Sequence, residues 1–87
     1  MDIRELKYFT QVAISANYSA AAEKLYISQP ALSKVIQKME RELGTKLFYT
    51  EHRQQCLTPE GQQLYEKASK VIAEYDEISE AVHTDKG

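Results

Sequence analysis

The sequence predicts an all-α-dominated fold: three helices, a short two-stranded hairpin and one long helix, in that order. Three observations predict it. Apolar residues recur at helical intervals in several segments, two strand-like stretches flank a polar turn near residue 53, and nothing breaks the helical pattern from residue 59 to about 82. With 87 residues and a mass of 10.0 kDa, the chain has room for one small domain.

Composition agrees with a folded helical domain. The chain is 43% apolar and 28% charged, with few glycines and prolines, unlike disordered or fibrous proteins. The single Cys56 excludes an internal disulfide and a cysteine-based zinc site. No stretch approaches the roughly 20 apolar residues that span a bilayer, and the amino terminus has no signal-peptide pattern. We therefore expect a cytoplasmic protein that does not enter the membrane.

The first two helices are predicted from their caps. Asp2 and Glu5 have the spacing of a capping box, and an apolar stripe follows over about four turns. Ser19 is the expected N-cap of a short, alanine-rich second helix that ends at Leu25.

The third helix is expected to start at Ser28, with Pro30 in its first turn and Gly44 as its C-terminal cap. Its inner stripe is apolar: Leu32, Ile36, Met39 and Leu43. A strand-like segment at 46–50, a polar loop at 51–55 and an apolar piece at 56–57 then predict the hairpin. Thr58 and Pro59 open the long helix.

Two short helices joined by a tight connection, over about residues 18–37, match a helix-turn-helix. The outer face of the second helix carries side chains that can reach base edges or phosphates in a major groove: Gln29, Ser33, Lys34, Gln37 and Lys38. A helix face that is merely exposed to solvent is the alternative.

If the helix-turn-helix prediction holds, the hairpin that follows would be a wing. Arg53 lies near its tip and could enter a minor groove or pair with a phosphate. Nearby Glu51 weakens that attraction, and a solvated loop charge is the other reading.

The long helix carries a sustained apolar seam. After Gly61 its members follow every three or four residues: Leu64, Ala68, Val71, Tyr75, Ile78 and Val82. A helix of about 36 Å outreaches a body with a radius of gyration of about 12 to 13 Å. Packing of the seam against the protein's own core is one explanation. Part of the seam would then remain exposed to solvent in a monomer, so we predict that the long helix pairs with a second copy.

The sequence contains no pattern that indicates an enzyme. Glu51, His52 and Cys56 suggest no complete catalytic set, and Gly44, Gly61 and Gly87 form no phosphate loop. We expect no enzyme activity, no cofactor and no metal.

The formal net charge of −2 argues weakly against a nucleic-acid partner until the chain is divided. Residues 1–23 carry −1, residues 24–53 carry +3 and residues 54–87 carry −4. The positive charge therefore lies on the helix-turn-helix and hairpin, and the acidic surplus lies on the long helix.

The whole chain resembles the amino-terminal DNA-binding domain of the LysR-type transcriptional regulators. The resemblance is carried by six motifs: IRELKYF (3–9), SAAAEKL (19–25), SQPALS (28–33), ERELG (40–44), LF (47–48) and LTPEG (57–61). It implies a winged helix-turn-helix of three helices plus a two-stranded wing (1–58), and a linker helix (59–87) through which two copies pair antiparallel.

The resemblance also implies roles for single residues. Ser28 would approach a phosphate, Arg53 would enter the minor groove, and four residues would face the major groove: Gln29, Pro30, Ser33 and Lys34. The family often has Arg where this chain has Thr50, so a backbone contact is expected to be missing or replaced by Lys46.

At the level of the whole protein, the resemblance implies a homodimer on double-stranded DNA at an AT-rich, inverted-repeat operator. It also implies a larger effector-binding domain and a tetramer in a longer parent, of which this chain is a fragment; a naturally short regulator is the alternative. The competing function is a protein-interaction module that pairs through the same helix and ignores DNA.

Overall fold

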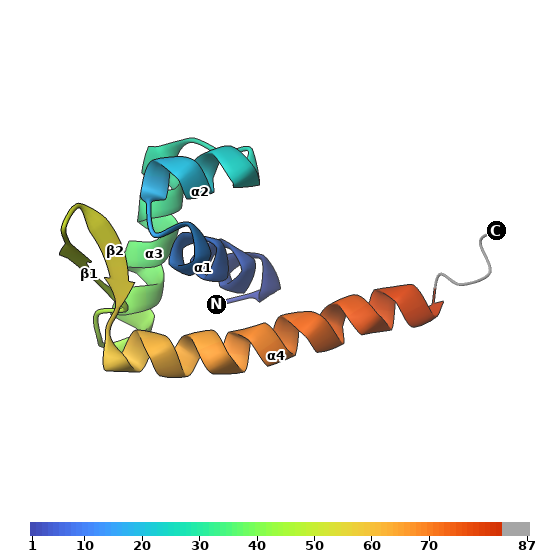
Figure 1. Ribbon diagram of the computed structural model, residues 1–87. Coiled ribbons are helices and arrows are strands. Elements are labelled where there is room, and N and C mark those ends of the chain that lie inside the picture. The colour runs from blue at the N-terminus through green and yellow to red at the C-terminus, as the bar shows by residue number, and fades with distance from the viewer. Residues whose placement is uncertain (83–87) are drawn as a thin grey trace.

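The computed structural model describes residues 1–82 and has the expected order of elements (Figure 1). The expectations for residues 83–87, which include Gly87 and the end of the linker segment, lie outside the described residues. The elements are α1 (Ile3–Ser15), α2 (Tyr18–Leu25), α3 (Gln29–Leu43), β1 (Phe48–Glu51), β2 (Gln54–Leu57) and α4 (Pro59–Val82).

Helix α1 begins as its cap predicts. The Asp2 carboxylate accepts a hydrogen bond from the Glu5 backbone N–H at 2.8 Å. The Glu5 side chain does something that the capping-box spacing did not predict: it lies buried against α3, where it accepts two hydrogen bonds from Lys38. Glu5, the second residue of the predicted capping box, therefore places its carboxylate between α1 and α3.

The predicted cap of α2 is wrong by two residues. Asn17, in an extended conformation, accepts from the Ala20 N–H at 2.8 Å, and Ser19 lies inside the first helical turn. Asn and Ser are both good N-caps, so the sequence alone does not decide between them. The helix ends at Tyr26, which has a left-handed backbone (φ 60°).

Helix α3 has the predicted start and stop. Ser28 Oγ accepts from the Ala31 N–H at 3.2 Å, and Gly44 takes the left-handed conformation after the last turn. Leu32, Ile36 and Met39 are fully buried. Leu43, the fourth member of the predicted stripe, is 43% exposed because it lies at the rim of the core, beside Leu47 and Leu64.

The hairpin has a tighter turn than predicted. The antiparallel register pairs Phe48 with Leu57 and Glu51 with Gln54, so the expected polar loop 51–55 shrinks to His52 and Arg53. Both turn residues have positive φ, as in the turns that best match strand twist. The Gln55 N–H donates to the Ala16 carbonyl at 2.9 Å, which ties the wing to the end of α1.

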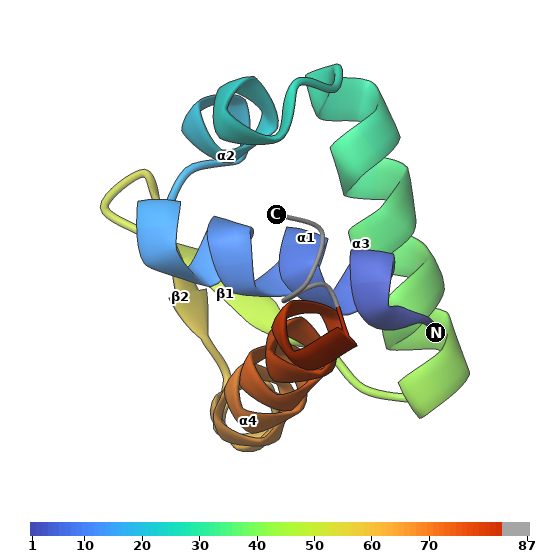
Figure 2. The same cartoon turned by 90° about the vertical axis from the view of Figure 1, so that its right-hand side faces the viewer.

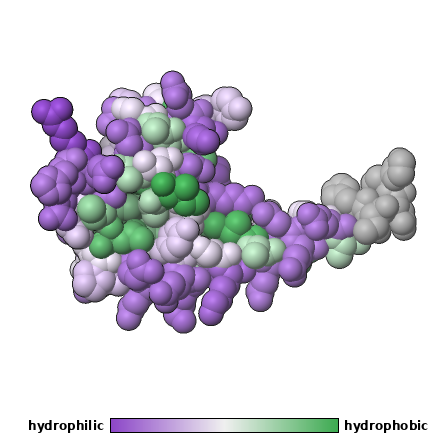
Figure 3. Space-filling model, viewed as in Figure 1, coloured by the Kyte–Doolittle hydropathy of each residue, from purple (hydrophilic) through white to green (hydrophobic). Residues whose placement is uncertain are grey.

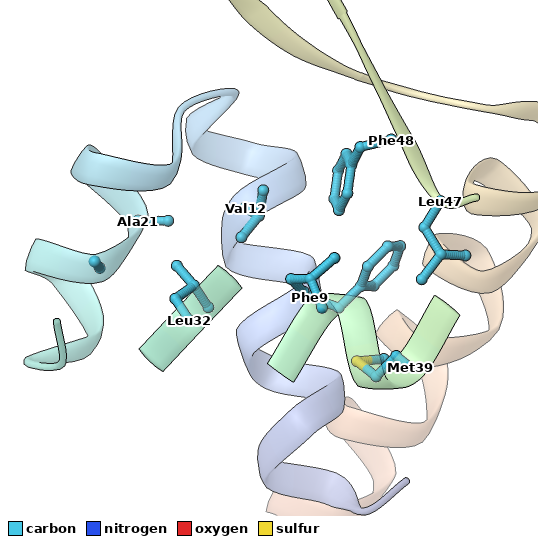
Figure 4. Close-up of a cluster of buried hydrophobic side chains, with 9 residues drawn as sticks. Phe9, Val12, Ala21, Leu32, Met39, Leu47 and Phe48 are labelled. Carbon is cyan, nitrogen blue, oxygen red and sulfur yellow. The ribbon is translucent and has the colours of Figure 1, made fainter. Parts of the chain in front are cut away.

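The core lies between the three helices and the start of β1 (Figure 4). Its largest fully buried side chains are Phe9, Val12, Leu32, Ile36, Met39 and Leu47. The Phe9 and Phe48 rings lie 5.3 Å apart, which joins α1 to the wing. Helix α1 packs against α2, α3, β2 and α4, so it fixes their relative positions.

Helix α4 runs beneath α1 and then projects beyond the body (Figures 1 and 2). Thr58 Oγ accepts from the Gly61 N–H and donates to the Lys46 carbonyl, which anchors the helix start. Further along, Lys7 Nζ lies 3.3 Å from an Asp76 carboxylate oxygen and 5.6 Å from the centre of the Tyr75 ring. Hydrophobic side chains gather where α1 meets α4, and the outer side of α4 is hydrophilic (Figure 3). In the part of the chain that the structure describes, no helix is long and apolar enough to cross a bilayer.

Candidate nucleic-acid interface

The outer face of α3 is a continuous polar stripe. Pro30, Lys34, Gln37 and Arg41 follow one another at intervals of four, three and four residues, so they share one side of the helix. This side is opposite the buried stripe, and all four residues are exposed. Ser33 lies on the flank of the stripe and is half-buried. The predicted residues Pro30, Ser33, Lys34 and Gln37 thus lie on one surface.

The start of α3 is exposed at one end of this stripe. Gln29 and Pro30 are both exposed, and Ser28 holds the Ala31 N–H as a cap. The first backbone N–H groups of a helix and its dipole favour negative charge nearby. A phosphate is therefore electrostatically favoured at this end of α3.

Lys38 follows Lys34 by one helical turn and lies on the flank of the polar stripe, but its side chain is turned toward Glu5 of α1. Its ammonium is 2.9 Å and 3.1 Å from the two Glu5 carboxylate oxygens and 3.2 Å from a Glu42 oxygen. Hydrogen bonds to Glu5 and then Glu42 raise the pKa of Lys38, and its ammonium is engaged by these two carboxylates although the side chain is 45% exposed. Lys38 thus differs from its neighbour Lys34 in its ion pairs with Glu5 and Glu42, not in its place along the helix.

Arg53 stands at the tip of the wing, exposed, as the sequence predicts. The wing and α3 lie at the same end of the body, and the distal part of α4 projects away from that end (Figure 1). A flat or convex partner could therefore touch both elements at once.

Arg41 was missing from the predicted contacts although it belongs to the same polar stripe. It follows Lys34 by seven residues, and this spacing was the signal that could have identified it. Its position extends the cationic character of the stripe by one helical turn beyond Gln37.

The apolar seam predicted on α4 is two adjoining stripes. Gly61 and Ala68 are buried against the protein's own body, together with the half-buried Tyr65 and Ile72. A second stripe, rotated from the first, starts at the half-buried Leu64 and continues on the distal half with three exposed residues, Val71, Ile78 and Val82.

Tyr75 lies between these two stripes. The residue is 46% exposed, and the Lys7 ammonium lies over its ring. The sequence could not separate the two stripes, because both repeat every three or four residues.

Over residues 1–82, no group of three or more His, Cys, Asp and Glu side chains could hold a metal ion.

Comparison with known proteins identifies the family. The model of the bacterial regulatory helix-turn-helix proteins of the lysR family matches residues 3–62. The chain is 41% identical over 78 residues to the uncharacterized HTH-type transcriptional regulator YcgK of Bacillus subtilis, covering 90% of this chain and 24% of YcgK. It is 40% identical, over 90% of this chain and 26% of the relative, to the HTH-type transcriptional regulator BenM of Acinetobacter baylyi. The chain thus spans about a quarter of the length of these relatives, which are regulators and not enzymes.

Solved structures agree over nearly the whole chain. A crystal structure of the BenM DBD with catB site 1 DNA superposes with a TM-score of 0.92 at 37% identity, covering 97% of this chain and 93% of that one. A CbnR DBD–DNA complex gives 0.87 at 32% identity, with 100% of both chains covered. The chain therefore belongs to the lysR family of bacterial regulatory helix-turn-helix proteins, and it has the winged helix-turn-helix fold of their DNA-binding domains.

Proposed function

We propose that this domain binds an AT-rich, inverted-repeat operator as a homodimer, with α3 in the major groove and the wing at the adjacent minor groove. The observation that carries the proposal is the exposed polar stripe on α3, at the same end of the body as the wing, whose turn carries Arg53 (Figure 1). The similarity to BenM and CbnR domains crystallised with DNA supports it. As a regulator of bacterial genes, the protein acts in the cytoplasm.

Each predicted residue takes a role that follows from its position. Gln29, Ser33, Lys34 and Gln37 can donate to or accept from base edges, and Pro30 offers an apolar surface to a thymine methyl group. Ser28 and Arg53 are assigned to the backbone and to the minor groove, respectively. Lys38 is given no base contact, because moving it would leave the buried Glu5 carboxylate with only the amino-terminal ammonium, 3.8 Å away, as a charged partner.

The exposed apolar stripe of α4 is assigned to the second copy. Val71, Ile78 and Val82 present apolar side chains to water at coiled-coil spacing, which a second α4 would cover. Residues 1–58 then form the DNA-binding unit and residues 59–87 the linker. In a full-length parent, a further effector-binding domain and a tetramer complete the assembly.

In vitro selection from a randomised duplex pool tests the DNA proposal. The wild-type chain should enrich an AT-rich inverted repeat whose half-sites lie about 10 base pairs apart or a multiple of that spacing. Replacing Ser33 and Lys34 together by alanine should lower affinity for the selected site by on the order of 1 to 3 kcal/mol and relax its sequence preference. Gln63→Ala, an exposed change on α4, is the control. If the wild type enriches no motif, the protein-interaction alternative is favoured.

Sedimentation tests the dimer. Val71→Asp and Ile78→Asp each place a charge on the apolar stripe and should give monomers, whereas Ser69→Asp, on the exposed outer side of α4, should leave the dimer intact. A wild-type chain that stays monomeric at high micromolar concentration would remove this part of the proposal.

A further inference from the structure

A shallow hollow lies between the second half of α3 and the segment that leads into β1. It measures about 450 Å³ and is lined by Gln37, Glu40, Arg41, Thr45 and Lys46. Gln37 and Arg41 belong to the polar stripe of α3, so the hollow opens beside the proposed DNA-reading surface. Of its lining residues, Gln37 is assigned above to base edges and Lys46 is named as the replacement for a missing backbone contact, whereas Glu40, Arg41 and Thr45 have no assigned contact with DNA.

The charges that line the hollow favour an anion. Arg41 is exposed and makes no ion pair with any residue in the described range 1–82. Lys46 is 81% exposed and lies 3.7 Å from one Glu40 carboxylate oxygen, a loose contact. Two cations against one carboxylate leave a net positive charge.

Glu40 is committed elsewhere. Its second carboxylate oxygen accepts the Leu47 backbone N–H at 2.8 Å, and the side chain is only 13% exposed. It therefore stays in place as the support of the β1 start, while Lys46 can move to a stronger anion. Gln37 and Thr45 add neutral hydrogen-bond donors at the edge of the hollow.

The position of the hollow identifies the anion. If α3 lies in a major groove and the wing in the adjacent minor groove, the sugar–phosphate strand that separates the two grooves must pass between them. The hollow lies in this interval, bounded by the α3 stripe on one side and by the base of the wing on the other.

We propose that Arg41 and Lys46 hold a phosphodiester of this strand, with Lys46 exchanging Glu40 for the phosphate. The proposal rests on the proposed function; it chooses the Lys46 contact over a missing one, and it adds Arg41, which the sequence did not predict, and the exchange of partners at Glu40. Such a backbone contact fixes the register of α3 on the duplex without reading sequence, so its loss weakens all duplexes alike.

The salt dependence of binding tests this proposal directly. Binding of the wild type, Arg41→Gln, Lys46→Gln and the double variant is measured by fluorescence anisotropy over a chloride series, on the selected operator and on a random duplex of equal length. The double variant should flatten the slope of log K against log salt by about 0.9 per protomer. Affinity for both duplexes should fall by the same factor, so their ratio is preserved.

The measurement has two controls, one variant and one competing ion. Lys70→Gln removes one exposed lysine from the outer side of α4 and should leave the slope unchanged. Inorganic phosphate should compete no better than chloride at equal ionic strength. Competition specific to free phosphate would instead mark a small-oxyanion site and overturn the assignment to the DNA strand.

The failure of this proposal is distinguishable from failure of the proposed function. If the Ser33 and Lys34 double variant loses operator preference while the Arg41 and Lys46 double variant keeps the wild-type slope, the phosphate site is wrong and the DNA-reading surface stands. A loss of preference between the two duplexes in the Arg41 and Lys46 variant would also overturn it, because that result indicates base reading.

Discussion

Gly61→Ala should destabilise the protein although alanine is the better helix former. Gly61 is the third residue of α4 and is buried where the helix crosses the start of β1. An added Cβ would overlap the Leu47 carbonyl oxygen and would lie 3.1 Å from both the Leu47 carbonyl carbon and Leu57 Cδ2. The obstacle is backbone, which cannot rotate away as a side chain tip can.

The magnitude follows from two opposed terms. Alanine gains at most about 1 kcal/mol of helix propensity over glycine. To restore ordinary van der Waals separation the first turn of α4 must move by about 1 Å, which forfeits a quarter to a half of the dispersion energy of the contacts it stretches. Overpacking of this kind costs about 1 to 3 kcal/mol. Because the obstacle is backbone, the cost should lie at the upper end of this range, about 3 kcal/mol. Subtracting the gain in helix propensity leaves a net destabilisation of about 2 kcal/mol, or a fall of about 10 °C in Tm.

Urea unfolding followed by circular dichroism measures this change. Gln63→Ala, exposed two residues further along α4, should leave the midpoint within about 0.5 kcal/mol of the wild type. If Gly61→Ala raised the stability by its helix propensity, the close approach of α4 to the Leu47 carbonyl would be wrong.

Three further predictions concern caps and ionisable groups. Asn17→Ala should lower stability by about 1 kcal/mol and Ser19→Ala by less than about 0.5; the reverse order would restore Ser19 as the cap. The hydrogen bond from the Glu5 backbone lowers the pKa of Asp2 below 3.8, so its stabilisation is complete above that value and is lost as pH falls through the lower, folded value. In Asp2→Asn the free energy of unfolding, followed by circular dichroism, should therefore fall less steeply as the pH is lowered into the acid range. The same steepness as in the wild type would contradict this. Burial, and then the Glu40 carboxylate, raises the pKa of Tyr18 from 10.0 to about 12, so the folded state should lose stability as pH rises from 10.0 to about 12. In an ultraviolet titration, Tyr18→Phe should remove a late tyrosinate step, and a titration identical to that of the wild type would refute the assignment.

Local signals were enough to predict most helix ends. Ser28 as a cap, Pro30 in the first turn and Gly44 after the last turn bound α3 as expected, because each acts within a few residues of its own position. The start of α4 after Thr58 follows from the same kind of signal. The wing and the exposed site residues on α3 were likewise readable, since periodicity tells the buried side of a helix from the exposed one.

Long-range contacts decided what the sequence could not. Lys38 looked like its neighbour Lys34 until the fold placed Glu5, 33 residues earlier, within 2.9 Å of it. The two stripes of α4 became distinct only once α1 covered one of them. The hollow beside Arg41 depends on the path of the chain from Gly44 to β1, which no helical or strand period describes.

Four turn residues with a left-handed backbone are positions at which substitution by glycine could raise the stability of the domain. Ala16, Tyr26, His52 and Arg53 all have positive φ, yet none is glycine. A left-handed backbone costs a residue with a Cβ roughly 1 to 2 kcal/mol. Replacing such a residue by glycine removes this cost, but part of the gain is offset because glycine has more conformational entropy in the unfolded chain. Three of the four lie in the helix-turn-helix connection or at the wing tip, and all three are exposed. Ala16 ends α1 and is assigned no contact with DNA, so Ala16→Gly offers a stabilised background in which damaging changes to the interface can be studied in a folded protein.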